Sequence, residues 1–398
     1  MNVRSFFAIN YFTYFLVFAL QIVIVRLCGA EVFGAYTVYL SMMAIVEAPI
    51  ITARSDSALK MLNASDSLSK TIWVCFKKDL ISSLLIAPLI ILLLGFYFDF
   101  LIGFLAALCL IFQSGFSALK NYFVVVHYRA IFTLAEAAIA CAILILLIFV
   151  TLISKSLIAL IYFYTFAALL KSLLIFSLFF ILNRNEKPNK TILGNGVYKA
   201  FSSILILRHL AINLILNTDI LILSMYIDLK QLASYKIVKS ICGIIFRMVA
   251  PLWRWKMFDI NMTIKNKEIG TYKNIQSQGL LLVSLVMGLA LFQFDNLAVL
   301  LAKVVYGINI REEGLPLTFM FLYIVSTLWF VSWYKIDMLY RSNKYLTLLI
   351  PSSLAFFQLI VGSFFFISLE SFVTLYSLLT TFFVLIVSIV FFMIKEPQ

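Results

Sequence analysis

The chain has 398 residues, of which 64% are hydrophobic, and its mean hydropathy is +1.06. This composition excludes an ordinary water-soluble domain, whose apolar share is about 45–50%. A net charge of +13 would suggest a nucleic-acid partner in a soluble protein. Here the basic residues gather in loops between apolar stretches, so no nucleic-acid partner is expected.

Long apolar stretches follow one another along the whole chain. A bilayer core needs roughly 20 apolar residues per helix, and helices satisfy their own backbone hydrogen bonds in lipid. Met1–Ser5 leads straight into the first stretch without a small-residue cleavage site, which favours a first span over a secretion signal. The predicted spans, about twelve in all, are 6–25, 35–55, 80–98, 101–121, 130–152, 156–182, 200–227, 231–251, 277–301, 314–340, 345–367 and 371–394.

A polar linker at 183–199 separates six predicted spans from six. The sequence thus predicts an N-terminal six-helix bundle over 1–182 and a C-terminal one over 200–398. Tyr36 and Tyr235 follow matching apolar segments and are 199 residues apart, which is half the chain length. The predicted fold class is an all-α integral membrane protein with two parallel six-helix repeats. This is the plan of a transporter that rocks one half against the other.

Lys and Arg are distributed unevenly between the two sides of these spans. With the N-terminus placed inside, twenty of them fall in inner segments and five in outer ones. The longest polar stretches also fall inside and are predicted to be loops: Arg54–Asp79, Asn183–Lys199 and Trp253–Gln276. The positive-inside rule therefore predicts that both termini are cytoplasmic.

Charged side chains within spans are costly in lipid, so they are the first candidates for function. Charged or polar candidates line up on the first, second, seventh and eighth spans, and on each span they fall within an arc of about 80° or less. A cavity lined by them would be polar and cationic, suited to phosphate and to hydroxyl-rich sugar. The candidates for substrate binding are Arg54, Arg208, Lys239, Arg247, Lys236, Asn10 and Gln21, and those for ion coupling are Glu47 and Asp219.

Structural interpretations of these residues stay open beside the functional ones. Glu47 and Arg54 can form an internal ion pair at a helix end. Arg54 and Arg247 can lie at the inner interface and serve topology alone. Lys236 can extend to the interface near the outer end of its span.

Arg208 and Asp219 lie on one face of the seventh span but are three turns apart. They are too distant to pair directly, so each needs another partner or water. Most aromatic residues are assigned to packing or to the lipid-facing surface. Only Tyr14, which shares a face with Asn10 and Gln21, is given a place in the cavity.

Motifs for catalysis and for nucleotide-driven transport are missing. Gly29 and Gly34 have the first spacing of a phosphate loop, but no Lys and Ser/Thr follow. The two histidines, His127 and His209, have no metal or triad spacing, and the five cysteines are scattered. No catalytic residue, bound metal or cofactor is therefore expected.

Two segments carry a resemblance to a known family. Ile22–Tyr36 resembles the signature at the first loop of Wzx-type O-antigen flippases: an apolar run, Arg-hydrophobic-small-Gly, an acidic residue, then aromatic-Gly-x-Tyr. Asn217–Ser224, leading to Ala233–Tyr235, resembles the matching place in the second half, with Asp219 at the acidic position. Ala233 departs from the first half, which has glycine there. Together with the length and the six-plus-six spans, these motifs mark the polysaccharide-transporter branch of the multidrug/oligosaccharidyl-lipid/polysaccharide exporter superfamily.

The resemblance implies a flippase for undecaprenyl-pyrophosphate-linked O-antigen repeat units in the bacterial inner membrane, working by alternating access and coupled to an ion gradient. It implies lipid-linked oligosaccharide, membrane lipids and a polysaccharide polymerase complex as partners. In this mechanism the basic candidates hold phosphates and sugar, and protonation of Glu47 or Asp219 biases the rocking.

Three other functions compete with this one. A drug/cation antiporter of the same fold should favour acidic residues, whereas the embedded charge here leans basic. A peptidoglycan-precursor flippase usually carries two further spans, which this sequence lacks. An O-antigen polymerase or ligase, the enzyme alternative, typically has a large outer loop, but the longest outer loop here, around Ala302–Gly314, is short.

Overall fold

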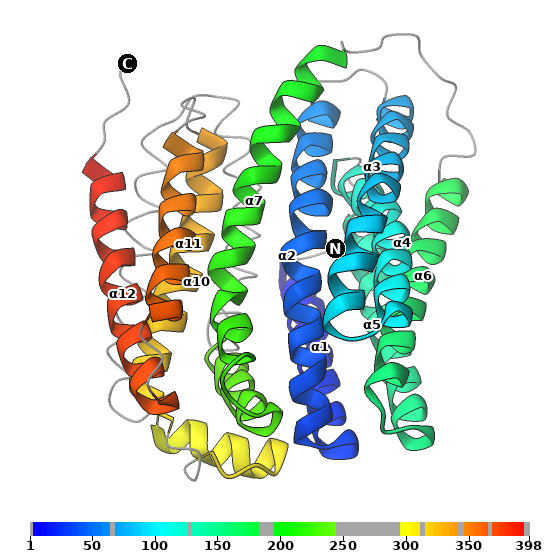
Figure 1. Cartoon of the computed structure of the whole chain (residues 1–398). Helices are drawn as coiled ribbons and strands as arrows, with labels where there is room; N and C mark the ends of the chain where they lie inside the picture. Colours follow the sequence, from blue (N-terminus) through cyan, green and yellow to red (C-terminus); the bar gives the residue numbers. More distant parts are fainter. Residues whose placement is uncertain are drawn as a thin grey trace. The chain divides into compact units, whose positions relative to one another are not determined.

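A computed structural model describes residues 3–63, 68–125, 129–182, 195–243, 295–310, 315–340, 346–364 and 368–393. Within these ranges the regular structure is helical, with no strand (Figure 1). Backbone contacts divide the chain into two compact units, Met1–Asn217 and Thr218–Gln398. The predicted linker at 183–199 lies mostly outside the described residues, so the predicted bundle boundaries stay a prediction.

The N-terminal unit is a bundle of long helices joined by short connections. Gly29 makes the tightest connection, between the first two helices, with a φ of 93° that side-chain-bearing residues adopt only under strain. Its N–H donates to the Val25 carbonyl at 3.1 Å. The first six helices are α1 Val3–Cys28, α2 Ala30–Asn63, α3 Leu68–Tyr97, α4 Phe100–Val125, α5 Arg129–Ile153 and α6 Leu157–Leu182.

Helix α4 lies at the centre of this packing, with α3 as its most extensive partner and α6 next. Gly103 brings α4 against the α3 backbone, because a Cβ there would lie only 2.6 Å from the Ile91 carbonyl oxygen. Toward α6, the Thr165 hydroxyl donates to the Leu105 carbonyl at 3.2 Å, and Ser172 donates to the Phe112 carbonyl. Small residues and hydroxyl-to-backbone bonds are the usual means of helix association in lipid.

The C-terminal unit starts inside helix α7, Asn195–Leu223, because the boundary between the units falls after Asn217. A turn at 224–228 leads to a helix at 229–243, and a helix at 295–301 continues into the π-helix Ala302–Tyr306. The last three helices are α10 Leu317–Tyr340, α11 Leu346–Phe364 and α12 Leu369–Met393.

Helix α12 packs on both α10 and α11. The rings of Tyr323 on α10 and Tyr376 on α12 meet edge to face, with centroids 5.3 Å apart. Gly362 of α11 lies so close to α7 that a Cβ would overlap the Ile222 methyl group. The end of α7 is therefore enclosed by helices of the C-terminal unit.

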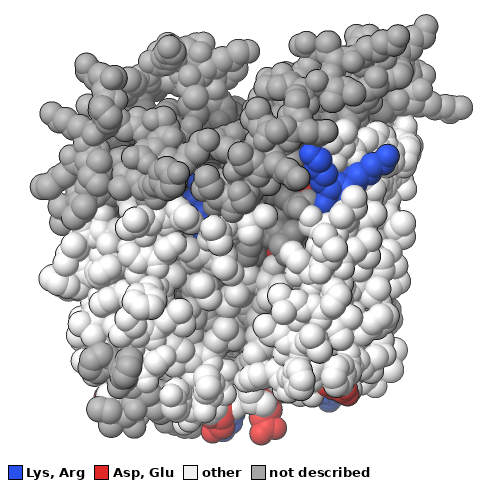
Figure 2. All heavy atoms as spheres, turned by 45° about the horizontal axis from the view of Figure 1, so that its top comes forward, with Lys and Arg blue, Asp and Glu red and all other residues white. Residues whose placement is uncertain are grey.

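The described helices match a multi-pass membrane protein. Six are long and apolar enough to cross a bilayer, and three shorter helices are apolar as well. Figure 2 shows a largely uncharged surface on the face drawn, with charged side chains near its upper and lower ends. The long apolar spans are Tyr11–Cys28, Trp73–Tyr97, Thr133–Ile153, Leu157–Ile181, Leu205–Leu223 and Leu369–Val387.

Most predicted spans coincide with helices, but two predicted loops are helical. The polar stretch Arg54–Asp79 belongs largely to α2 and α3, which run on to Asn63 and begin at Leu68. A fall in hydropathy marks where a helix leaves the membrane, but the helix itself can continue beyond that point. Ala, Leu, Lys and Met in this stretch favour helix, so α2 and α3 extend into it. The outer loop predicted from Ala302 starts as the π-helix. Most of the predicted span 277–301 and the loop Trp253–Gln276 lie outside the described residues.

Candidate functional site

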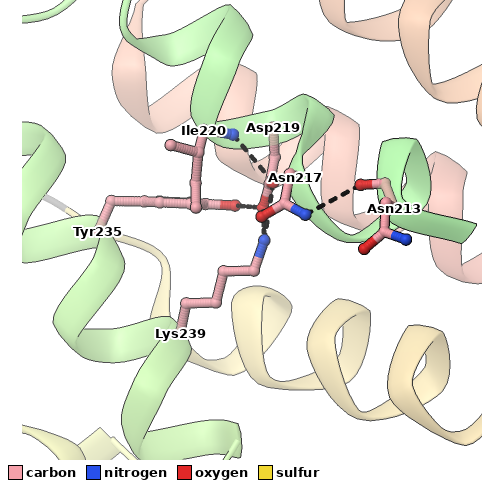
Figure 3. A network of polar contacts seen from close by, with 6 residues as sticks. All are labelled: Asn213, Asn217, Asp219, Ile220, Tyr235 and Lys239. Atoms are coloured by element: carbon pink, nitrogen blue, oxygen red, sulfur yellow. Dashed lines mark hydrogen bonds and ion pairs between the residues drawn. The ribbon is translucent and has the colours of Figure 1, made fainter. Parts of the chain in front are cut away.

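A fully buried carboxylate lies near the end of α7. Asp219 has an exposed fraction of 0%, and four polar contacts from three residues reach its two oxygens (Figure 3). The Ile220 N–H donates to Oδ1 at 2.9 Å, and the Tyr235 hydroxyl donates to Oδ2 at 2.6 Å. The Lys239 ammonium lies 2.7 Å from Oδ1 and 2.6 Å from Oδ2. Both oxygens thus have two partners each.

The helix at 229–243 positions the two side chains that reach Asp219. Tyr235 and Lys239 are four residues apart, so they project from the same face, one turn above the other. Asp228 starts this helix by accepting a hydrogen bond from the Gln231 N–H at 2.7 Å, the arrangement of an N-cap. The short turn between the helices and this cap together bring Tyr235 and Lys239 back alongside α7. We call Asp219, Tyr235 and Lys239 the carboxylate triad.

Further tyrosines surround the carboxylate triad within the C-terminal unit. The Asp219 charge acts electrostatically on the hydroxyls of Tyr323 and Tyr376, from α10 and α12. Both tyrosines are almost fully buried, as is Gln358 of α11. The Gln358 amide finds no hydrogen-bond partner among the described residues. The interior of this unit is therefore polar around a paired, neutralised charge.

A second embedded carboxylate lies in the N-terminal unit. Glu47 on α2 has an exposed fraction of 8% and feels the charge of Lys171 from α6. Nearby, the Gln113 amide of α4 donates to the Tyr164 hydroxyl of α6 at 3.3 Å. Tyr39 packs edge to face on Tyr164, with ring centroids 6.1 Å apart. Glu47 acts electrostatically on Tyr39 and Tyr164, so these groups share one polar region.

The structure brings together two predicted site residues that the sequence assigned to different roles. Asp219, predicted for ion coupling, pairs directly with Lys239, predicted for substrate binding. Lys236 lies half-buried on the same helix. Arg208 is buried on α7, with 4% exposed, and belongs to the N-terminal unit rather than to the unit of Asp219.

The remaining predicted site residues lie on or beyond the edge of the described structure. Gln21 is half-buried on α1, and its Oε1 has no hydrogen-bond partner among the described residues. Asn10 and Arg54 lie on α1 and α2, but their side chains are not among those described. Arg247 falls outside the described residues.

Tyr235 is a member of the triad that sequence reasoning missed. The sequence marks Tyr235 as a repeat position, and most aromatic residues are assigned there to packing or to the lipid-facing surface. Tyr235 is buried, and its hydroxyl also donates to Asp219, a role that the sequence analysis does not give it. The signal was present in the spacing, since Tyr235 stands one turn before Lys239 on the same helical face. No comparable spacing links Gln113 to Tyr164, which come from different helices.

The architecture matches solved membrane transporters. The chain aligns over 96% of its length, and 91% of the other chain, with a multidrug resistance MATE family transporter of the MOP superfamily in an outward-facing conformation, with a TM-score of 0.58. The chain has the MATE fold. An inward-facing MATE transporter aligns over 99% of this chain and 97% of its own, with a TM-score of 0.53. The sequence identity to both is 14%. At this identity the structural similarity establishes the fold alone.

A third similar structure is a MOP superfamily transporter from Pyrococcus furiosus, described as having a binding pocket of reversed polarity. It matches with a TM-score of 0.58 and 15% identity, over 97% of this chain and 92% of its own. No protein-family model and no curated protein matches the sequence. The MATE-like fold confirms the predicted all-helical class with two repeats.

Proposed function

We propose that this protein is a flippase that moves a polyprenyl-diphosphate-linked oligosaccharide, an O-antigen repeat unit on undecaprenyl pyrophosphate, across the bacterial inner membrane by alternating access. The observation that carries the proposal is the carboxylate triad. Asp219 and Tyr235 lie in the segment that resembles the flippase signature, and they meet in one hydrogen-bonded cluster with Lys239. The MATE fold supplies the two repeats that such a mechanism needs.

The triad favours an anionic cargo over a cationic one. A cation exporter needs a carboxylate free to receive its cargo, but Lys239 lies against both oxygens of Asp219. The ammonium group is a mobile point charge on a flexible stem, and it can bind phosphate oxygens. The Lys239 ammonium thus fits a diphosphate headgroup, and the tail would stay in lipid.

Glu47 is the better of the two predicted coupling residues. In this structure Asp219 is paired directly with Lys239, whereas Glu47 is buried with Lys171 acting on it electrostatically from α6. A buried carboxylate is costly while charged, so uptake of a proton or a cation there would change the energy of the N-terminal unit substantially. Coupling would then arise because the two conformations expose Glu47 differently to the two sides.

The other expectations from the sequence belong to this proposal. The protein would lie in the bacterial inner membrane with both termini in the cytoplasm, because twenty of the assigned Lys and Arg fall on that side. Its cargo would be handed to a polysaccharide polymerase complex on the outer side. It would act as a transporter and not as an enzyme, without cofactor or metal.

Deletion of the gene tests the proposal directly, with lipopolysaccharide and lipid-linked intermediates as readouts. A flippase predicts loss of all O-units from the lipopolysaccharide core, with complete single units held on the inner leaflet. Core capped by a single unit would show that units still cross, and would point to a polymerase. Unchanged polysaccharide would refute the proposal.

A drug/cation antiporter is the second candidate, and the buried carboxylate of Glu47 is the observation that favours it. Cells lacking the gene would then become more sensitive to lipophilic cations, and wild-type protein, but not Glu47→Gln, would restore resistance. Unaltered drug sensitivity together with lost O-units would exclude this candidate.

A further inference from the structure

The carboxylate triad has an unequal exposure that a purely structural ion pair does not require. The side chain of Lys239 is 14% exposed, whereas that of Asp219 is 0% exposed. The Lys239 side chain is therefore the more accessible member of the pair, and Asp219 is the enclosed one. A ligand approaching the pair would meet the cation first.

Asp219 is also built to tolerate the departure of Lys239. Without the ammonium, Oδ1 still accepts the Ile220 N–H at 2.9 Å and Oδ2 still accepts the Tyr235 hydroxyl at 2.6 Å. Breaking a buried ion pair is costly mainly because it leaves an uncompensated charge. Here each oxygen keeps one donor, and hydrogen bonds to charged groups are the stronger ones. The pair can therefore open at a reduced cost.

We propose that the Asp219–Lys239 pair is an exchangeable latch: the diphosphate of the lipid-linked cargo competes with Asp219 for the Lys239 ammonium, and Tyr235 is a positioning residue that holds Asp219 in place while Lys239 is away. This inference rests on the proposed function, because it names the part of the cargo that the site recognises. A diphosphate carries more charge than one carboxylate, so it can draw the ammonium from Asp219, whereas a neutral headgroup cannot.

The latch also gives the site a means of selection. With no anionic ligand, Lys239 is neutralised by Asp219, so the carboxylate triad does not present an unpaired cation to every lipid phosphate. A ligand must offset the loss of the Asp219 contact before it gains any affinity, which penalises weakly charged phospholipid headgroups. Asp219 thus lowers affinity and raises specificity, the opposite of the role of an ordinary binding residue.

Binding of undecaprenyl pyrophosphate to the purified full-length protein in lipid nanodiscs tests the latch. Asp219→Asn should bind at least about tenfold more tightly than wild type, equivalent to about 1.4 kcal/mol, because its Lys239 has no charged competitor. Lys239→Gln should bind at least about tenfold more weakly. Undecaprenol, which has the same tail and no charge, should bind all variants equally.

Tyr235→Phe separates the latch from a simple charge effect. The change alters no charge, but it removes the donor that stabilises Asp219 once Lys239 has left, so diphosphate affinity should fall by about threefold or more. Asp228→Asn and Lys230→Gln are matched controls at the exposed start of the same helix, with the same changes in charge, and they should bind as wild type does. Asn remains a good N-cap, so Asp228→Asn keeps the helix start.

The possible outcomes distinguish the latch from the proposed function. Wild-type affinity in both Asp219→Asn and Tyr235→Phe would overturn the latch and leave an anion flippase standing. Binding by Lys239→Gln equal to wild type would also overturn it. No discrimination between undecaprenyl pyrophosphate and undecaprenol by wild type would overturn the proposed function itself. If Asp219→Asn does not fold, as judged by size-exclusion chromatography, the nearly isosteric Tyr235→Phe decides.

Discussion

Replacement of Gly103 by alanine should weaken the N-terminal unit at the contact between α3 and α4. A Cβ at this position would lie 2.6 Å from the Ile91 carbonyl oxygen and 3.0 Å from both Ile91 Cα and the Gly95 nitrogen. All three atoms belong to the α3 backbone, so no side-chain rotation relieves the overlap. The two helices must separate by about 0.8 Å to reach ordinary contact at 3.4 Å.

The net cost follows from two opposing effects. Overpacking of this kind costs about 1–3 kcal/mol, and the rigid backbone places it at the upper end. Alanine in a helix interior returns about 1 kcal/mol relative to glycine. We therefore expect Gly103→Ala to lower the free energy of unfolding by about 1–2 kcal/mol, with a fall in melting temperature of about 3–6 °C for a unit of this size.

Gly95→Ala is the matched control at the same helix contact. Its Cβ would meet the Phe100 ring first, at 3.1 Å and 3.4 Å, and a ring can shift where a backbone cannot. The control should melt within about 1 °C of wild type or slightly higher. Melting of detergent-solubilised protein, followed by fluorescence-detected size-exclusion chromatography, measures both variants. Equal melting temperatures for the two variants would refute the close backbone contact.

Three further outcomes follow from the described contacts. Lys239→Gln should lower the free energy of unfolding by about 2 kcal/mol in a thermal melt, less than the usual loss of about 3–5 kcal/mol, because the Ile220 N–H and the Tyr235 hydroxyl still bind Asp219. Adding Asp219→Asn should recover at least half of the loss, because it removes the unpaired charge, and a double variant as unstable as the single one would contradict this. Glu47→Gln should keep wild-type protein level in the membrane but make transport independent of the pH gradient in a proteoliposome flux assay; retained gradient dependence would remove Glu47 from coupling. Gly29→Ala should lower the free energy of unfolding by about 1–2 kcal/mol through backbone strain alone, because nothing lies within 4 Å of its Cβ position. A melting temperature equal to that of wild type would show that the turn relaxes.

The sequence predicts the spans well because one effect dominates them. A run of about 20 apolar residues has few alternatives to a membrane helix, so α1, α5 and α6 match their predicted ranges to within about three residues. The ends of α2 and α3 depend instead on helix propensity and on contacts beyond the membrane. Hydropathy does not report these, and Arg54–Asp79 was accordingly predicted as a loop.

The candidate site was predicted in its parts but not in its connections. The cost of a charge within a span singles out Asp219 and Lys239 as candidates. The two are 20 residues apart on different helices, and no periodicity within one helix shows that they meet. The turn at 224–228 brings the helix at 229–243 back alongside α7, so Lys239 meets Asp219. Two residues predicted for different roles therefore lie in one site. Tyr235 was not predicted as a site residue, because its hydroxyl gains a role only through the hydrogen bond to Asp219.

The buried pair also has a consequence for the order in which the chain is made. Asp219 emerges from the ribosome before Lys239, and an unpaired aspartate costs about 3 kcal/mol at the centre of an inserting helix and less near its end, where Asp219 lies. Because the triad is closed by a single short turn, α7 and the helix at 229–243 can enter the bilayer together as a hairpin whose charges already cancel. We expect insertion of α7 in a translation-arrest experiment to become efficient only when the nascent chain is long enough to include Lys239.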